Sequence, residues 1–201
     1  MIQLRVKKYR LLLLLPSILL AGCQWFSWHK PISTVLPILS PDSLGQSLVA
    51  LQKVSGERAG SHYTMLFQVE VDQQRLVLVG SSATGNSLFS VEYKQGALNS
   101  NVSPLLPAQL DPRYVLADFQ LVFWPASAIN QQLIGSDYRL VDHPLRRELW
   151  QAEELLIAID YSEQNHWQGL VYFDNKRWDY RYTIETLQRQ ILPTTTHQEK
   201  P

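Results

Sequence analysis

The chain has 201 residues, a length that suits one compact domain, and its 18 basic residues balance 18 acidic ones. Four of the basic residues and none of the acidic ones precede Cys23, so the rest of the chain is mildly acidic, which disfavours nucleic-acid binding. Cys23 is the single cysteine, which argues against a disulfide framework or a thiolate metal site.

Residues 1–22 have the layout of an export signal. A basic head precedes the apolar run at 11–21, which has about half of the roughly 20 residues that a membrane-spanning helix needs. The small residues Ala21 and Gly22 then let a peptidase approach the backbone closely. This layout predicts that residues 1–22 form a signal peptide.

The motif Leu20-Ala21-Gly22-Cys23 resembles the lipobox of bacterial lipoproteins. The resemblance implies cleavage before Cys23, transfer of a diacylglycerol to its sulfur, and acylation of the new amino group by a fatty acid such as palmitate. Several acyl chains hold a protein at a membrane, whereas one chain holds it only marginally. Because Gln24 replaces the aspartate that commonly retains lipoproteins at the inner membrane, the resemblance also implies the periplasmic face of the outer membrane. The alternative is an ordinary signal followed by an incidental cysteine.

Residues 23–46 are expected to form the lipidated N-terminus and a tether, because Pro31, Pro37 and Pro41 interrupt a segment without sustained periodicity. The aromatic residues behind the lipid leave two alternatives. Either they lie in the headgroup layer of the membrane, or they form an apolar strap on the domain. These residues are Trp25, Phe26 and Trp28.

Alternating hydrophobic residues predict a first group of antiparallel strands. From Tyr63 to Val71, apolar residues share one parity and polar residues the other, with Leu66 as the exception. Two more strands follow at 76–80 and 89–93. The sequence therefore predicts a meander with one apolar face.

The periodicity becomes helical after Asp111, which is expected to cap a helix that has Pro112 in its first turn. Pro125 is expected to end or kink this helix, and Ser127 to cap a short second one. Helices between two groups of strands predict a plug on the concave side of a sheet. The expected plug residues are Phe119, Trp124 and Pro125.

Strand-like alternation returns at 155–161, 167–173 and 178–184, and residues 193–201 are expected to be a frayed tail. We therefore expect a single domain at 47–192, of the α+β class and mainly β.

Two segments, "LADFQLVFWPASAINQQL" at 116–133 and "VYFDNKRWDYRYTIET" at 171–186, resemble an uncharacterised family of Gram-negative lipoproteins that is often found beside aryl-polyene biosynthesis genes. The order of elements, with "LVLVGSSATGNSLFSVEYKQGAL" at 76–98, is similar to the LolA/LolB lipoprotein-carrier fold. This resemblance covers most of 47–190. It implies a strongly curved antiparallel half-barrel sheet wrapped around a helical plug, and a carrier or receptor for an apolar molecule held between the two.

Burying a chain in such a cavity contributes about 0.8 kcal/mol per methylene. The expected ligand-cavity residues have the apolar parity of their strands, although the same pattern is typical of an ordinary core. They are Phe67, Val69, Phe89, Val91, Tyr93, Ile157, Ile159, Trp178, Tyr180 and Tyr182.

The sequence contains no motif of enzyme chemistry: it lacks a Gly-x-Ser-x-Gly elbow, a His-Glu-x-x-His pair and a phosphate-binding glycine loop. Asp142 and His143 are expected in a turn before Pro144. Glu153 and Glu154 are expected on opposite faces of a strand, which makes them poor acid/base partners. We expect no enzymatic activity, no cofactor and no metal.

Two charged features leave alternatives open. Arg146, Arg147 and Glu148 form the densest charge group, which is either a solvated turn or edge, or a docking point for a partner or a ligand headgroup. Asp118 lies in an apolar helix, where it either faces solvent or is buried and satisfied by a backbone amide or an arginine.

The sequence therefore predicts an outer-membrane-anchored periplasmic lipoprotein that binds or transfers an apolar acyl- or polyene-type molecule, or a lipoprotein, toward the outer membrane. Its expected partners are the membrane, a hydrophobic ligand, and periplasmic carrier or envelope proteins. The alternative is a structural or interaction lipoprotein of an envelope assembly, without a small-molecule ligand.

Overall fold

The computed structural model describes residues 36–58, 61–104, 106 and 111–193. The predicted signal peptide, the lipobox with Cys23, the aromatic residues behind it and most of the predicted tail lie outside the described residues. Those assignments therefore stay predictions.

The described part of the chain forms one ten-stranded sheet in which all neighbouring strands are antiparallel. The strand order is β5-β4-β3-β2-β1-β10-β9-β8-β7-β6. The strands are β1 (Ser47–Arg58), β2 (Ser61–Val71), β3 (Arg75–Ser82), β4 (Ser87–Lys94), β5 (Ala97–Val102), β6 (Tyr138–His143), β7 (Arg146–Gln151), β8 (Glu154–Tyr161), β9 (Leu170–Asn175) and β10 (Tyr180–Leu192).

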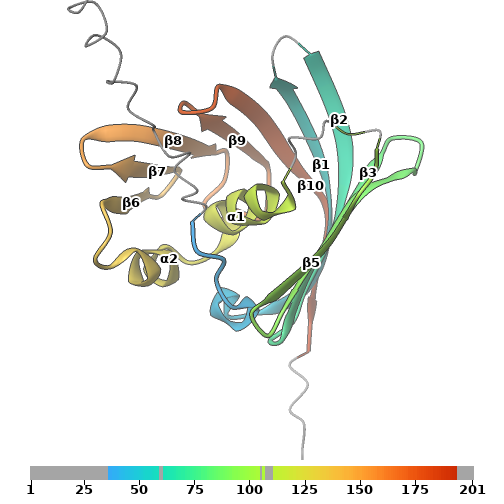
Figure 1. Ribbon diagram of the computed structural model, residues 1–201, viewed down its shortest axis with the longest axis horizontal. Helices are drawn as coiled ribbons and strands as arrows, with labels where there is room; N and C mark the ends of the chain where they lie inside the picture. The colour runs from blue at the N-terminus through green and yellow to red at the C-terminus, as the bar shows by residue number, and fades with distance from the viewer. Residues whose placement is uncertain (1–35, 59–60, 105, 107–110, 194–201) are drawn as a thin grey trace, which may run out of the picture. The chain divides into compact units, whose positions relative to one another are not determined.

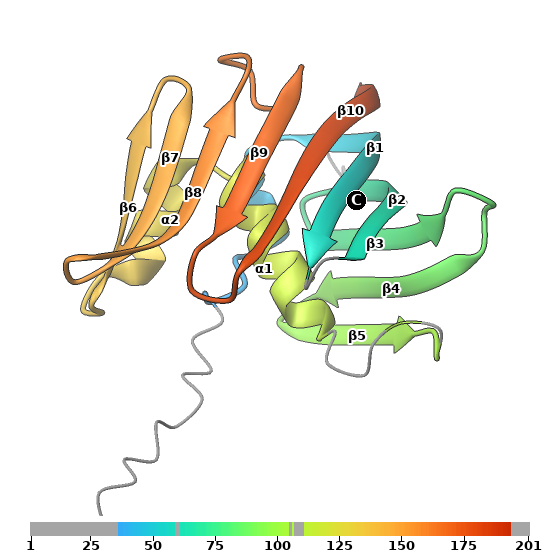
Figure 2. The ribbon, with the colours of Figure 1, turned by 90° about the horizontal axis from the view of Figure 1, so that it is seen from above.

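The sheet consists of two five-stranded meanders that meet at the first and last strands. β1 pairs with β10 along its whole length, and Figure 2 shows the two side by side near the middle of the sheet. The helices α1 (Pro112–Phe123) and α2 (Ala126–Leu133) connect the two meanders. The predicted placement of helices between two groups of strands is confirmed.

The sheet is open and curved, and Figure 1 shows it bending around α1. Register shifts interrupt the strand pairing near Gln52, near Gly80 and near Trp150. Irregular pairing of this kind, of which the β-bulge is the common form, bends a strand and increases the local twist. These irregularities add to the curvature that the ordinary twist of strands gives to a sheet.

α1 begins as the sequence predicts, because the Asp111 side chain accepts a hydrogen bond from Arg113 N at 2.9 Å and Pro112 occupies the first turn. The prediction that Ser127 caps α2 is wrong. Pro125 already has extended backbone, and α2 begins directly after it without a side-chain cap. Among the described residues, no helix has the length and apolar character needed to cross a membrane.

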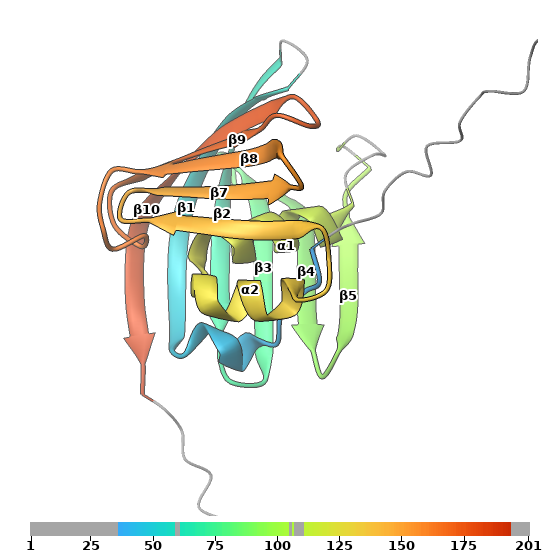
Figure 3. The ribbon, with the colours of Figure 1, turned by 90° about the vertical axis from the view of Figure 1, so that its left-hand side faces the viewer.

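Both helices lie over one face of the sheet, which we call the inner face (Figure 3). Leu116 and Val122 of α1 belong to the same buried cluster as Leu48, Leu78 and Ile159 of the strands. The helices and both meanders therefore share one hydrophobic core.

Residues 36–46, the end of the segment that the sequence predicts as a tether, pack on the domain. They include the 3-10 helix η1 (Pro41–Leu44), and Leu39 and Leu44 are buried in the core. Trp124 Nε1, at the end of α1, donates to Ser43 Oγ at 2.9 Å. We call residues 36–44 the strap.

Candidate functional site

Six of the ten predicted cavity residues are core residues that are at most 9% exposed. They are Phe67, Val69, Phe89, Val91, Ile157 and Ile159. Tyr93 is half-buried, and its hydroxyl donates to Ile38 O of the strap at 3.5 Å. The other three, Trp178, Tyr180 and Tyr182, lie together at the end of the sheet where β9 turns into β10.

Aromatic rings gather at this end of the inner face. Tyr182 stacks on Phe173 of β9 with ring centroids 4.4 Å apart, and Tyr180 lies 6.2 Å from Tyr182. Trp178, in the turn, is 40% exposed and meets Tyr114 of α1 edge to face at 4.8 Å. These rings therefore join the turn, two strands and the helix.

Tyr63 of β2 extends the group across β1. Gly56 of β1 is opposite both Tyr63 and Tyr182 in the register, and a Cβ atom at Gly56 would overlap the Tyr63 ring. Glycine is thus required for the ring to lie over β1. We call the rings of Tyr63, Tyr114, Phe173, Trp178, Tyr180 and Tyr182 the aromatic cluster.

Asp118 of α1 provides a carboxyl group beside this cluster. Tyr180 Oη donates to Asp118 Oδ2 at 2.6 Å, and Asn175 Nδ2 donates to Tyr180 Oη at 3.0 Å. Asn175 Oδ1 in turn accepts from Trp178 N at 3.0 Å, so the same side chain shapes the turn. A tyrosine hydroxyl, which the sequence analysis did not suggest, is therefore a hydrogen-bond partner of Asp118 among the described side chains.

Burial among the rings raises the pKa of Asp118 to about 7, although the hydrogen bond from Tyr180 acts in the opposite direction. Burial, and then the neighbouring Asp118 carboxylate, raise the pKa of Tyr180 and of Tyr182. Asp118 therefore changes its charge near neutral pH, while the two tyrosines stay protonated.

A second acceptor lies deeper on the inner face. Gln52 of β1 is fully buried, and its Nε2 donates to Thr186 Oγ1 at 3.2 Å. Its Oε1 is buried without a hydrogen-bond partner in the described structure. An unsatisfied buried acceptor costs about 1–3 kcal/mol, so this oxygen is a position where a donor would be stabilised.

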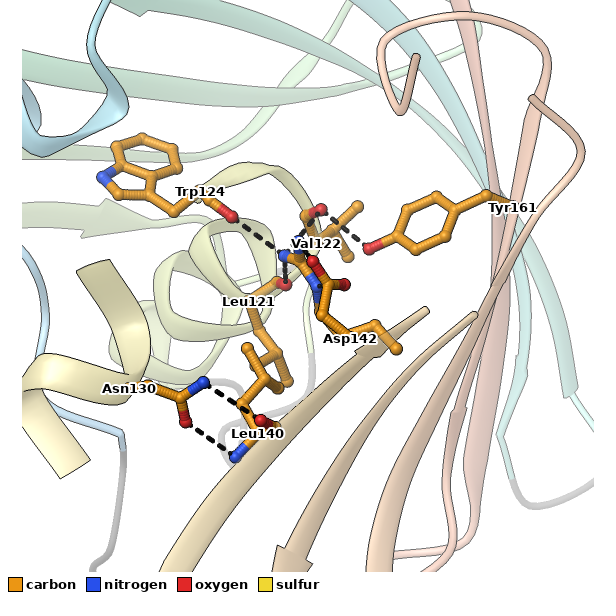
Figure 4. Close-up of polar contacts among 8 residues, drawn as sticks. Leu121, Val122, Trp124, Asn130, Leu140, Asp142 and Tyr161 are labelled. Atoms are coloured by element: carbon orange, nitrogen blue, oxygen red, sulfur yellow. Dashed lines mark hydrogen bonds and ion pairs between the residues drawn. The ribbon is translucent and has the colours of Figure 1, made fainter. Parts of the chain in front are cut away.

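Arg147 holds the other end of α1 (Figure 4). Its Nη1 donates to Leu121 O at 2.7 Å and to Trp124 O at 2.9 Å, which are carbonyls at the end of the helix. The guanidinium also donates to both carboxylate oxygens of Asp142, at 2.9 and 3.3 Å. This cation at a helix C-terminus gives hydrogen bonds to carbonyls that have no partner within the helix, and it interacts favourably with the helix dipole.

Tyr161 completes this contact, because its hydroxyl donates to Val122 O at 2.9 Å. His166 stacks on the Tyr161 ring with centroids 3.6 Å apart, and burial lowers the pKa of His166. Residues from β6, β7 and β8 and the loop after β8 therefore fix the position of α1.

The interpretation of the charged group as a solvated turn or edge is wrong for Arg147, which is 2% exposed. Arg146 does lie at the surface, where it pairs with Glu148 at 2.7 Å and Asp160 at 2.6 Å. Asp142 and His143 lie in β6 and not in a turn, and Asp142 is opposite Arg147 of the neighbouring strand β7.

The predicted plug residues fall into two groups. Phe119 and Trp124 are buried, and their rings are 6.0 Å apart, whereas Pro125 is exposed. Between the strap and the helices there is a cavity of about 10 Å³, enough for about one water molecule. It is lined by residues that include Leu36, Gln120 and Leu133.

A larger groove of about 650 Å³ lies on the outer face, the face turned away from the helices. Half-buried apolar side chains of β1 and β3 line it, with polar ones from β2 and β10 between them. The apolar residues are Val49, Leu51, Val77 and Val79. The sequence predicted no site on this face.

The described residues contain no group of three or more His, Cys, Asp or Glu that would hold a metal ion. Glu153 lies in the turn before β8 and Glu154 at its first position, both exposed. The aromatic cluster includes three residues that were not among the predicted cavity set, Tyr63, Tyr114 and Phe173. Tyr63 begins the first alternating run of the sequence, which was the available signal for it.

Comparisons with known proteins place these features in context. The crystal structure of a DUF1329 family protein from Desulfovibrio piger matches with 10% identity and a TM-score of 0.37, over 75% of this chain and 88% of that one. A crystal structure described as a putative outer membrane lipoprotein-sorting protein domain, from Vibrio parahaemolyticus, matches with 11% identity and a TM-score of 0.37, over 77% and 88%. No curated protein matches the chain. Residues 49–188 match the model of the family described as protein of unknown function DUF3261, and the chain belongs to that family.

Proposed function

We propose that this protein binds and passes on an apolar, acyl- or polyene-type molecule, and that the aromatic cluster on the inner face is where the molecule binds. The observation that carries the proposal is the aromatic cluster itself. Its rings come from β2, β9, β10, α1 and the β9–β10 turn, and five of the six lie outside the fully packed set of core residues. Sites for small apolar ligands are typically lined by aromatic side chains with a few placed polar groups.

The polar groups of the proposed site are Asp118 at the rim and Gln52 deeper on the inner face. An apolar chain that lies against the rings and Val54, between these two, removes apolar surface from water on both sides. In this proposal α1 is the plug of a LolA/LolB-like half-barrel. A longer ligand then requires α1 to move, since Gln52 and Val54 are already buried in the fold.

The remaining parts of the proposal come from the sequence. Cys23 carries the lipid anchor, Gln24 directs the protein to the periplasmic face of the outer membrane, and the protein acts without catalysing a reaction. The position of the proposed site at one end of an open sheet supports transfer of the ligand at the membrane surface.

The second candidate function is an interaction lipoprotein without a small-molecule ligand. The outer-face groove favours it, because four half-buried apolar side chains interrupt a face that is normally polar in antiparallel sheets. In that case Val79→Glu would abolish recruitment of an envelope partner, and variants of the aromatic cluster would not.

The first experiment is native mass spectrometry on residues 24–201, produced in the periplasm without the lipid anchor. This piece contains the whole described fold, including the β1–β10 pairing that joins both meanders. We expect a stoichiometric apolar adduct, identified after organic extraction. The Trp178→Ala variant should lose it, since Trp178 is exposed in the cluster.

Tyr172→Ala is the matched control. Tyr172 is 49% exposed on β9 but alternates with Phe173, so it lies on the outer face. Retention of the adduct in this control, with loss in Trp178→Ala, supports the proposal. Protein that stays bare when offered fatty acids, phospholipids and polyenes contradicts it.

A further inference from the structure

The two edges of the ten-stranded sheet differ in how their outward backbone groups are satisfied. At the β6 edge, Asn130 of α2 pairs with both backbone groups of Leu140, and Tyr138 N donates to Ser136 Oγ at 3.3 Å. β6 also contains charged side chains, which discourage pairing with a further strand. This edge of the sheet is therefore protected.

β5 forms the opposite edge, and the turn before it determines which of its backbone groups point outward. Both residues of this turn have positive φ, of 51° and 79°, so it is a two-residue hairpin turn and Lys94 and Ala97 are the hydrogen-bonded pair beside it. Hydrogen-bonded and non-hydrogen-bonded pairs then alternate, and the bond from Ser103 N to Leu88 O at 2.7 Å agrees with this order. The residues whose N–H and C=O groups point away from β4 are therefore Leu98, Ser100 and Val102.

These outward groups form an unprotected edge. Among the described residues, β5 pairs only with β4, and no other group bonds to the outward N–H and C=O groups. Leu106 N donates to Ser103 O at 3.0 Å, which turns the chain directly after the strand, and Leu106 packs against the core on the inner face. Residues 97–102 contain no charged residue and no proline, which normally protect an edge. Figure 2 shows β5 at the border of the sheet.

The sequence of β5 is complementary to itself in antiparallel pairing. When two copies are centred on Ser100, this residue meets itself, and Leu98 meets Val102 of the second copy. These are the residues with outward backbone groups, and each pair exchanges two hydrogen bonds, so the two copies share about six. Leu98 and Val102 already pack partly against the core, and pairing buries more of both. Asn99 meets Asn101 on the outer face, and no like charges come together.

We propose that β5 pairs with β5 of a second copy of this chain, with Ser100 at the twofold axis, so that two ten-stranded sheets join into one continuous sheet. The inner faces of both copies then lie on the same side of the joined sheet. The contact involves 6 residues of each chain, which is small for a protein interface, so we expect a weak dimer that depends on concentration. The inference concerns the sheet edge and does not depend on the proposed function.

The first test is sedimentation equilibrium of residues 24–201 at concentrations up to about 0.5 mM. Wild type should form a dimer as the concentration increases. Ser100→Pro removes an outward N–H that the ladder with β4 does not use, so the monomer keeps its strand pairing while the dimer loses a hydrogen bond from each copy. We expect this variant to raise the dissociation constant of the dimer about tenfold or more.

The second test locates the contact by disulfide crosslinking, because residues 24–201 contain no cysteine. In a Ser100→Cys dimer the two thiols face each other, with Cα atoms about 5.5 Å apart, which a disulfide can span. Mild oxidation should therefore give a covalent dimer on a non-reducing gel. Ser87→Cys is the matched control, since Ser87 is exposed at the start of β4 and far from the proposed axis, and it should stay monomeric.

Three results would overturn the inference. The first is a wild-type protein that stays monomeric at every concentration, which would leave the edge to another segment or to another protein. The second is a wild-type dimer that Ser100→Pro does not weaken, because the copies then join elsewhere. The third is crosslinking of Ser87→Cys as readily as Ser100→Cys, which would mean random collision.

Discussion

The side-chain amide of Gln120 takes the place of a neighbouring strand for Leu39. Gln120 Nε2 donates to Leu39 O and Gln120 Oε1 accepts from Leu39 N, both at 2.8 Å. Asn130 of α2 does the same for Leu140 of β6, with both bonds at 3.0 Å. Each helix thus attaches an extended segment through one carboxamide, and backbone groups that would otherwise be buried unpaired are satisfied.

Replacing Gln120 by Ala should therefore release the strap. Two buried backbone groups of Leu39 lose their partners, which predicts a loss of about 2–4 kcal/mol in the free energy of unfolding. Urea denaturation measures this loss, and hydrogen exchange at the Leu39 amide measures the release. Gln131→Ala, at an exposed position of α2, should change stability by less than about 0.5 kcal/mol. Persistent protection of Leu39 in Gln120→Ala would contradict the role of the amide.

Arg147 and its neighbour Arg146 provide a matched pair of identical side chains. Arg147→Met leaves the carbonyls of Leu121 and Trp124 without their donor and should cost about 3–5 kcal/mol. Arg146→Met removes only surface ion pairs and should cost about 1 kcal/mol or less. Chemical denaturation measures the free energy of unfolding of both variants relative to wild type. Equal losses would mean that Arg147 does not hold the end of α1.

The alternating pattern identifies the inner face of the strands, but it does not tell which part of that face α1 covers. Phe89 and Tyr182 share the pattern, yet Phe89 is a core residue that is 2% exposed, whereas Tyr182 is half-buried in the aromatic cluster. The contact between Asp118 and Tyr180 joins residues that are 62 positions apart. Only the register of the ten strands and the placement of α1 bring Asp118 and Tyr180 together, and no local sequence pattern predicts either of these.

Two local departures explain why the sequence did not predict β7 and why β9 begins later than predicted. β7 has a buried arginine at a position that alternation reserves for apolar residues, so "RRELWQ" looks like a charged turn. β9 begins at Leu170 rather than Trp167, because Gly169 has a left-handed backbone with φ of +66° and ends the preceding turn. Trp167 instead packs on Phe123 from the loop, with ring centroids 4.1 Å apart.

Gly80 should tolerate no side chain. It lies between Phe67 and Phe89 in the register, and a Cβ atom there would overlap the buried Phe89 ring. Gly80→Ala should therefore lower the midpoint of thermal unfolding, with a cost of about 1–3 kcal/mol from overpacking. Combining it with Phe89→Leu should cost less than the sum of the two single changes, because the smaller side chain makes room for the methyl group. Strict additivity in this double-mutant cycle would refute the contact.

Asp118 predicts a pH dependence of stability with a definite sign. Its pKa rises from 3.8 in the unfolded chain to about 7 in the fold, so the unfolded chain releases the proton first as the pH increases. The stabilising contribution is complete below about pH 4 and is lost as the pH rises to about 7. One pKa unit corresponds to about 1.4 kcal/mol, and because Asp118 is half-buried rather than fully buried we expect only part of the shift, about 1–2 kcal/mol. Asp118→Asn keeps an oxygen for the Tyr180 hydroxyl and carries no charge, so it should be more stable than wild type at pH 8 and should lose that advantage toward pH 4.

Urea denaturation of both proteins between pH 4 and pH 8 measures this difference in stability, with Asp137→Asn, at an exposed position between α2 and β6, as the control. Parallel stability curves for wild type and Asp118→Asn would mean that the Asp118 carboxyl does not titrate in this range.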